Sequence, residues 1–99
     1  MINAIISAES SWDPKAESAY ARGLMQISKT ALEQVNMSYN LNFSYDDMFN
    51  PDKNILAGTA YLRWLFKFFS KEPEEIQLIL VIMAYNWGCG NVRKWLKTK

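Results

Sequence analysis

The sequence predicts an all-α fold in a single small domain, and three observations support this prediction. Apolar residues recur at helical spacing in several segments of the chain. Two prolines, Pro51 and Pro73, stand beside polar or acidic residues in the pattern that starts a helix. The 99 residues are 49% hydrophobic and 14% aromatic, which is enough apolar side chain for one core. We therefore expect about five helices and no substantial sheet.

The first helix is expected over the first ten residues, where four side chains share one face: Ile2, Ile5, Ile6 and Glu9. Asp13-Pro14 is expected to end it, and the segment 11–22 has no period and should form a loop. Ser28 is the expected N-cap of a short helix over Thr30 to Val35. The polar run from Asn36 to Asn50 is expected to be irregular.

The second half of the chain predicts three more helices. Asn50-Pro51 starts a helix that should run to Ser70 or Lys71. A helix from Pro73 carries the apolar run 76–87, and Gly88 with Gly90 should end it. A buried strand is the alternative for this run, but its length and its end signals favour a central buried helix. A last short helix is expected over Asn91 to Leu96.

Composition excludes several classes of function. Lys and Arg number 11 against 10 Asp and Glu, so the chain lacks the basic balance of a nucleic-acid-binding protein. There is no His, and Cys89 is the only cysteine, which excludes a disulfide within the chain, His-based nucleophile systems and most zinc sites. We expect neither a metal nor an organic cofactor. Any acid–base chemistry must use a carboxylate, a lysine or a tyrosine.

The chain also lacks membrane and export signals. Its longest apolar run, Leu78 to Tyr85, is eight residues long and too short to span a bilayer. No secretory signal peptide is visible at its beginning, so the compartment cannot be read from these residues.

Glu9 is the first candidate for chemistry. Its neighbours Ile5, Ile6 and Ala8 are apolar, and a desolvated carboxyl holds its proton to higher pH. Such an acid can protonate a leaving group near neutral pH. Spacing alone leaves a second reading open, in which Glu9 is the first solvent-facing residue at the end of the helix.

Two further segments carry polar groups beside glycines. Gly23-Leu24-Met25-Gln26 allows a close backbone approach and offers an amide, although Leu24 and Met25 also suit a core. Ala84-Tyr85-Asn86 ends a very apolar helix, and a buried Tyr85 hydroxyl needs a partner, for which Glu9 is a candidate.

Four segments in this order resemble the catalytic domain of lytic transglycosylases of the soluble (SLT) type. They are Glu9-Ser10-Ser11-Trp12-Asp13-Pro14, Gly23 to Gln26, Asn50 to Leu62, and Ala84 to Gly90. The resemblance covers almost the whole chain. It implies that residues 1–99 form one SLT-type catalytic domain, with a goose-type-lysozyme-like helical fold and without some of the helical residues that usually precede the E-S motif.

The resemblance also implies an activity and a site. The family cleaves the MurNAc–GlcNAc β-1,4 bond of peptidoglycan, and Glu9 matches its single catalytic acid and base, giving 1,6-anhydromuramyl products. Tyr85 would position the Glu9 carboxyl, Met25 and Gln26 would line the cleft, Ser18 would contact substrate and Asn86 would support the site. Ser10 is expected to brace the helix end. The implied partners are glycan strands, bound by a monomer in the cell envelope or periplasm; a secreted or phage-borne source is also compatible.

Two other functions remain open. A muramidase that uses water needs a second carboxylate, for which Asp13 or Glu17 could be proposed. A glycan-binding module without activity is the other alternative. The sequence does not reveal exo or endo cleavage, or which stem peptides are accepted.

Overall fold

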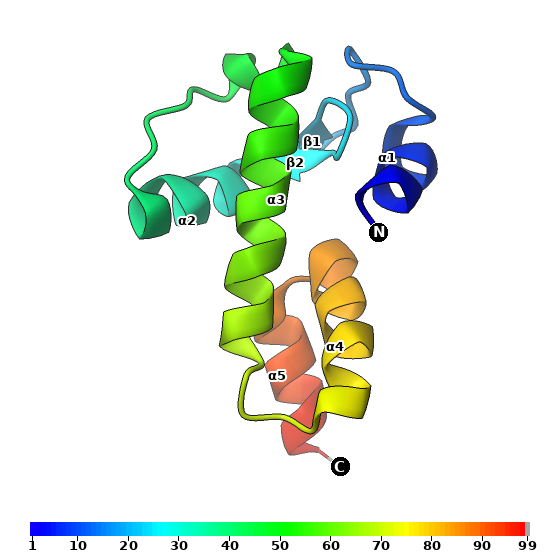
Figure 1. Cartoon of the computed structure of the whole chain (residues 1–99), viewed down its shortest axis with the longest axis vertical. Helices are drawn as coiled ribbons and strands as arrows, with labels where there is room; N and C mark the ends of the chain where they lie inside the picture. The colour runs from blue at the N-terminus through cyan, green and yellow to red at the C-terminus, as the bar shows by residue number, and fades with distance from the viewer. Residues whose placement is uncertain (99) are drawn as a thin grey trace. The chain divides into compact units, whose positions relative to one another are not determined.

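The computed structural model describes residues 1–98, which contain five α-helices, one short 3-10 helix and a sheet of two short strands (Figure 1). The predicted all-α class without a substantial sheet is confirmed. The residues form two compact units, one over Met1–Tyr61 and one from Leu62 onward, which are described separately below. None of the described helices is both long enough and apolar enough to cross a membrane.

Helix α1 (Ile2–Ser10) opens the first unit and buries Ile6 on one face. The helix ends because Ser11 adopts a left-handed conformation with φ 52°, and the Ser11 amide donates to the Ser7 carbonyl at 3.1 Å. The expected stop at Asp13-Pro14 therefore lies beyond the true end of the helix. Helical spacing located α1 correctly, but the left-handed cap is formed by a serine, which sequence rules do not favour.

Strands β1 (Ala21–Arg22) and β2 (Ile27–Ser28) form an antiparallel pair that the sequence analysis missed by treating 11–22 as loop. Ala21 pairs with Ser28, and Arg22 pairs with Ile27. Two-residue strands are too short to show an alternating pattern, so periodicity cannot detect them. The pairing closes the turn Gly23–Gln26, which belongs to the candidate site.

Helix α2 (Lys29–Tyr39) begins after Ser28, whose hydroxyl accepts from the Ala31 amide at 3.1 Å, so the predicted N-cap is confirmed. The helix runs four residues beyond the expected end at Val35. Asn36 does not break it, because its side-chain amide exchanges two hydrogen bonds with the backbone of Phe43, at 2.9 and 3.2 Å. Asn40, with φ 55°, ends the helix instead.

The 3-10 helix η1 (Asp46–Phe49) lies within the segment expected to be irregular. It is stabilised by a reciprocal cap: the Asp47 amide donates to Ser44 Oγ at 3.2 Å, and the Ser44 amide donates to Asp47 Oδ2 at 2.8 Å. Helix α3 (Pro51–Phe68) follows. Asn50 Oδ1 accepts from the Lys53 amide at 3.0 Å, which confirms the predicted Asn-Pro start.

Apolar side chains from every helix of the first unit are buried, and they form its core. They are Ile6, Leu24, Met25, Ile27, Ala31, Leu32, Val35, Met48 and Ala57. One polar side chain, Asn54 on α3, is fully buried among them.

The second unit contains the end of α3 and the antiparallel pair of α4 (Glu74–Trp87) and α5 (Cys89–Lys97), which pack along each other (Figure 1). Gly88, with φ 96°, turns the chain between them. Gly88 ends α4 as predicted, but α5 starts at Cys89 rather than Asn91 and includes Gly90.

Helix α4 is not the fully buried helix that its sequence predicts. Leu80, Val81 and Ala84 are buried, whereas other large apolar residues of this helix are about half exposed: Leu78 at 48%, Ile79 at 57% and Ile82 at 48%. Helix α5 packs along α4, and one neighbouring helix covers one side only. The apolar composition of 76–87 therefore predicts the helix but not its burial.

Candidate active site

Glu9 lies in the last turn of α1 and is half-buried. Burial removes water from the carboxyl and raises its pKa above the ordinary 4.5. Desolvation by burial is the cause of this shift. A carboxyl in this environment keeps its proton at higher pH than an exposed glutamic acid, which is the property expected of a general acid.

Ser10 joins the end of α1 to the turn Gly23–Gln26. Its hydroxyl lies 2.7 Å from the Leu24 carbonyl oxygen and 3.0 Å from the Ile6 carbonyl oxygen. The expectation that Ser10 braces the helix end is confirmed. Because Glu9 directly precedes Ser10, this bond fixes the stretch of helix that carries the acid against the turn.

The turn approaches the backbone of η1 so closely that only glycine fits at position 23. Gly23 has φ 82°, and a Cβ there would lie 2.0 Å from the Met48 carbonyl oxygen and 2.1 Å from Asn54 Nδ2. The Gly23 amide also donates to the Ala16 carbonyl at 2.7 Å. The glycine of this motif is therefore required by packing as well as by backbone conformation.

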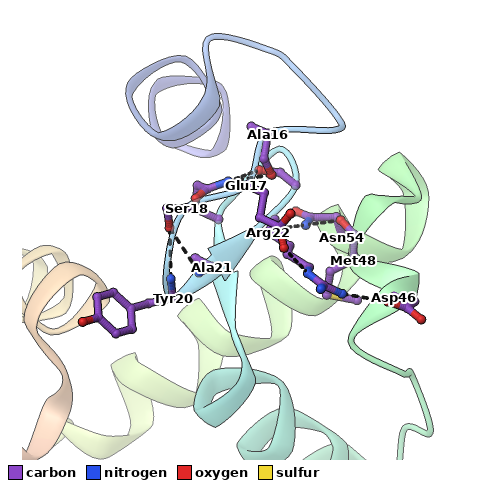
Figure 2. Close-up of polar contacts among 11 residues, drawn as sticks. Ala16, Glu17, Ser18, Tyr20, Ala21, Arg22, Asp46, Met48 and Asn54 are labelled. Carbon is purple, nitrogen blue, oxygen red and sulfur yellow. Dashed lines mark hydrogen bonds and ion pairs between the residues drawn. The ribbon is translucent and has the colours of Figure 1, made fainter.

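Asn54 holds the turn from within the core. Its Oδ1 accepts from the Met25 amide at 2.9 Å, and its Nδ2 donates to the carbonyls of Arg22 at 2.9 Å and Met48 at 2.8 Å (Figure 2). One side chain thus connects α3, the turn, β1 and η1. Asn54 is part of the third motif, but sequence analysis gave it no role, since spacing does not reveal a partner 29 residues away.

Met25 does not reach the surface, contrary to its expected place in the lining of a cleft. Its side chain is fully buried, and a Cβ added to Gly58 of α3 would lie 2.3 Å from its sulfur. The Met25 amide is bound by Asn54, so the backbone and the side chain both face the core. Met25 supports the turn from the core side, and its buried side chain offers no surface to a sugar.

Gln26 is half-buried at the end of the turn, with φ 51°. Its Nε2 donates to the carbonyls of Ala16 at 3.1 Å and Gly23 at 3.0 Å. These bonds use the amide nitrogen to close the loop, so the group that remains for a ligand is the carbonyl oxygen, an acceptor.

Ser18 lies in the exposed loop before β1 (Figure 2). Its Oγ accepts from the amides of Tyr20 at 3.4 Å and Ala21 at 3.2 Å. Its hydroxyl proton has no protein acceptor in these bonds. The structure therefore places Ser18 in a tight, solvent-facing turn, and its contact with substrate stays a prediction.

Arg22 organises the outer side of this loop, and the sequence analysis did not identify it. Its guanidinium pairs with Glu17 at 2.8 Å and with Asp46 at 2.7 Å (Figure 2). It also lies over the rings of Tyr45, at 4.1 Å, and Phe49, at 4.9 Å. No local pattern signals these contacts, because Asp46 is 24 residues away.

Both carboxylates proposed as a water-activating base already accept hydrogen bonds within the protein. Asp13 Oδ1 accepts from the Lys15 amide at 2.9 Å in a turn, and Glu17 is bound by Arg22. Among the described residues, no group of three or more His, Cys, Asp or Glu side chains is arranged to hold a metal ion.

Tyr85 and Asn86 belong to the second unit, on the last turn of α4. Tyr85 is half-buried, and Asn86 is exposed with its Nδ2 donating to the Ile82 carbonyl at 3.3 Å. The predicted hydrogen bond from Tyr85 to Glu9 stays a prediction, as does the role of Asn86.

These motifs agree with a known protein family. The family model described as the transglycosylase SLT domain matches residues 1–99. The chain belongs to this family.

Curated relatives of this SLT domain match nearly all of it. The soluble lytic murein transglycosylase of Escherichia coli K12 is 38% identical over 96 residues, with 94% of this chain and 14% of that protein covered. Membrane-bound lytic murein transglycosylase F of Desulfosudis oleivorans is 36% identical over 95 residues, with 94% and 19% covered. The SLT domain therefore spans less than one fifth of the length of these relatives.

Solved structures confirm the fold of the SLT domain. The 70 kDa soluble lytic transglycosylase of Escherichia coli has a TM-score of 0.83 and 33% identity, covering 97% of this chain and 15% of that one. The same protein in complex with bulgecin A gives the same TM-score, identity and coverage.

Proposed function

We propose that this SLT domain is a peptidoglycan lytic transglycosylase that cleaves the MurNAc–GlcNAc β-1,4 bond in the cell envelope. The observation that carries the proposal is the environment of Glu9: a half-buried carboxyl with a raised pKa, held beside the Gly23–Gln26 turn by Ser10. The family match and the names of the relatives support the choice of substrate.

In the proposed reaction Glu9 acts twice. The protonated carboxyl first donates its proton to the glycosidic oxygen, and the C1–O bond breaks as GlcNAc leaves. The N-acetyl oxygen of the substrate stabilises the positive charge at C1. The Glu9 carboxylate then takes the proton of the C6 hydroxyl, whose oxygen bonds to C1 and forms the 1,6-anhydro ring. The acid returns to its starting state, so no second carboxylate is needed.

Loop residues would supply binding rather than chemistry. The Gln26 carbonyl oxygen can accept from an N-acetyl N–H or a hydroxyl, and the Ser18 hydroxyl can donate to a sugar oxygen. Tyr85 and Asn86 belong to the fourth motif. This membership supports the proposal that Tyr85 positions the Glu9 carboxyl and that Asn86 supports the site.

The bonds of Asp13 and Glu17 favour this reaction over hydrolysis. A muramidase needs a free carboxylate to activate water. Asp13 caps a turn and Glu17 neutralises Arg22, so using either as a base would break an existing contact.

Product analysis separates the three functions. The protein is incubated with purified peptidoglycan, and the released muropeptides are identified by mass spectrometry. We expect 1,6-anhydromuramyl ends from wild type and from Asp13→Asn, and none from Glu9→Gln. Reducing ends without anhydro products would identify a hydrolase instead. Binding without release of products, unchanged in Glu9→Gln, would identify a module that only binds glycan.

Bulgecin A provides a second test. The solved complex supports the proposal that this SLT domain binds the same compound. We expect bulgecin A to inhibit the release of muropeptides and to raise the melting temperature of wild type. Full activity at saturating bulgecin A, with no thermal shift, would argue against a transglycosylase-type site.

A further inference from the structure

A second site is suggested by a cavity of about 510 Å³ within the second unit. Three segments line it: the end of α3, the loop that follows, and the last turns of α5 (Figure 1 shows these elements). Its lining includes four cations, Lys67, Lys71, Arg93 and Lys97, and a single acid, Glu72. None of the residues assigned to sugar cleavage belongs to this lining.

The charge of this cavity selects an anionic ligand. Four cations against one acid leave a net charge of +3 in the lining, whereas the chain as a whole carries +1. A concave surface lined by one sign of charge concentrates ligands of the opposite sign. Two of these cations, Arg93 and Lys97, come from the C-terminal helix α5.

Arg93 gives the cavity a fixed recognition group. Its guanidinium lies 4.3 Å from the centre of the Phe68 ring. Phe68 is itself held between Trp64, at 5.2 Å, and Phe69, at 4.9 Å between ring centres. A guanidinium stacked on a ring is oriented before the ligand arrives, and its planar fork matches a carboxylate.

The rest of the lining suits an extended peptide better than a compact phosphate. Leu96, which is half-buried, supplies apolar surface for methyl groups. Glu72 would repel a dense negative charge but can pair with an amino group. The peptide stems of murein combine these features, because they carry several carboxylates, alanine methyl groups and the amino group of a diamino acid.

We propose that this cavity binds the peptide stem of murein through its carboxylates. The choice of ligand rests on the proposed function, and the site would then recognise the stem in addition to the sugar chain. Arg93 and Lys71 would bind carboxylates, and Glu72 would bind the amino group. The site would distinguish stem peptides by their carboxylates and their amino group.

The experiment measures binding of a free synthetic stem, the tetrapeptide Ala–γ-Glu–diaminopimelate–Ala, by calorimetry and by NMR shifts. Wild type is compared with the double variant Lys71→Ala/Arg93→Ala and with Lys94→Ala. Lys94 is an exposed cation next to Arg93 that does not line the cavity, so its variant controls for the loss of one nearby positive charge outside the site. The altered side chains are exposed, and circular dichroism confirms that each variant is folded.

We expect saturable binding to wild type, about a tenfold loss in the double variant and no loss in Lys94→Ala. A stem with its carboxylates converted to amides should lose affinity by a similar factor. Equal affinity in all three proteins, equal affinity for the amide form, or no saturable binding would overturn the proposal. Tighter binding of inorganic phosphate than of the stem would overturn the assignment to peptide.

The measurement is independent of sugar cleavage. It uses no glycan, and Glu9→Gln should bind the free stem as well as wild type does. Failure of the proposed function would appear as missing anhydro products, whereas failure of this site would appear only in stem binding.

Discussion

The candidate site of the first unit depends on individual side chains, and Glu9 is the most important of them. Its carboxyl is desolvated by the end of α1 and has a raised pKa, while the neighbouring Asp13 and Glu17 are bound to an amide and to a guanidinium. Three acids within nine residues therefore differ because their surroundings differ. Of the three, Glu9 is the one whose pKa is raised by burial, which is the property expected of a general acid.

The raised pKa of Glu9 makes stability depend on pH in a defined direction. The folded state binds this proton more tightly than the unfolded state, where the pKa is about 4.5. Glu9 therefore lowers stability as the pH rises from 4.5 through the raised value, and it has no such effect below 4.5. We expect Glu9→Gln to melt at a higher temperature than wild type at pH 7.

The matched measurement is a series of thermal melts of both proteins from acid to neutral pH. The difference in melting temperature between the two proteins should shrink toward zero as the pH falls to the pKa of Glu9 in the unfolded state and below it, because both side chains are then neutral. A difference that is the same at every pH would show that packing, rather than ionisation, separates the two proteins.

The pH dependence of activity should report the same group. Donation to the glycosidic oxygen requires the protonated acid, so kcat/KM on soluble glycan strands should fall as the pH rises above the Glu9 pKa. The midpoint is expected above 4.5. A midpoint at or below 4.5 would mean that a different group controls the rate.

Ser11 offers a test of backbone strain at the residue scale. It ends α1 with φ 52°, a conformation that is unfavourable for serine by about 1 kcal/mol relative to glycine. We expect Ser11→Gly to raise the free energy of unfolding by up to about 1 kcal/mol in urea titrations. Ser7→Gly, within the same helix, should lower it by about 0.5 kcal/mol. Equal effects at both positions would rule out relief of strain.

At the scale of elements, the structure shows how one turn is held by three separate segments. The turn Gly23–Gln26 is held by α1 through Ser10, by α3 through Asn54, and by its own loop through Gln26. The core-facing residues of the turn keep the surface residues in place. Motif residues can thus be essential without touching substrate.

Asn54 should be the most sensitive of these supports. Replacing it with alanine removes three hydrogen bonds, two buried and one partly buried, and leaves the Met25 amide and two carbonyls without this partner. We expect Asn54→Ala to lower the free energy of unfolding by about 3 kcal/mol. The control is Asn50→Ala, which removes an exposed cap of the same helix and should cost about 1 kcal/mol.

Chemical denaturation of the two variants measures both effects. Similar losses for Asn50→Ala and Asn54→Ala would contradict the central role of Asn54 in the turn.

At the scale of the whole molecule, 99 residues leave little surplus stability. A change of 1 kcal/mol shifts the melting temperature of a domain of this size by about 4–8 °C. The variants described above should therefore be distinguishable in thermal melts.

Helix α3 begins in the first compact unit and ends in the second. A break in this helix would therefore affect residues of both units. Arg63 lies in its middle and is exposed. Arg63→Pro removes a backbone donor and should destabilise the protein by about 3 kcal/mol or more. Arg63→Ala keeps the helix and should change stability by less than about 0.5 kcal/mol. Comparable melting temperatures for the two variants would contradict a continuous helix.

The amino-acid sequence by itself determined the five α-helices, the caps at Ser28 and Asn50, the end of α4 at Gly88, and the family. Ser28, Asn50 and Gly88 act on the backbone within a few residues, and such local effects can be read directly from the chain. The sequence also indicated Glu9, because its apolar neighbours are adjacent along the same helix.

Tertiary structure alone decided which side chains face the solvent and which polar groups meet. Met25 faces the core, Asn54 binds the turn from α3, and Arg22 joins two loops through Asp46. Each of these results depends on partners more than 20 residues away, and local patterns contain no information about such contacts. Burial and pairing arise when distant segments pack, so the desolvated environment that raises the pKa of Glu9 is a product of the fold.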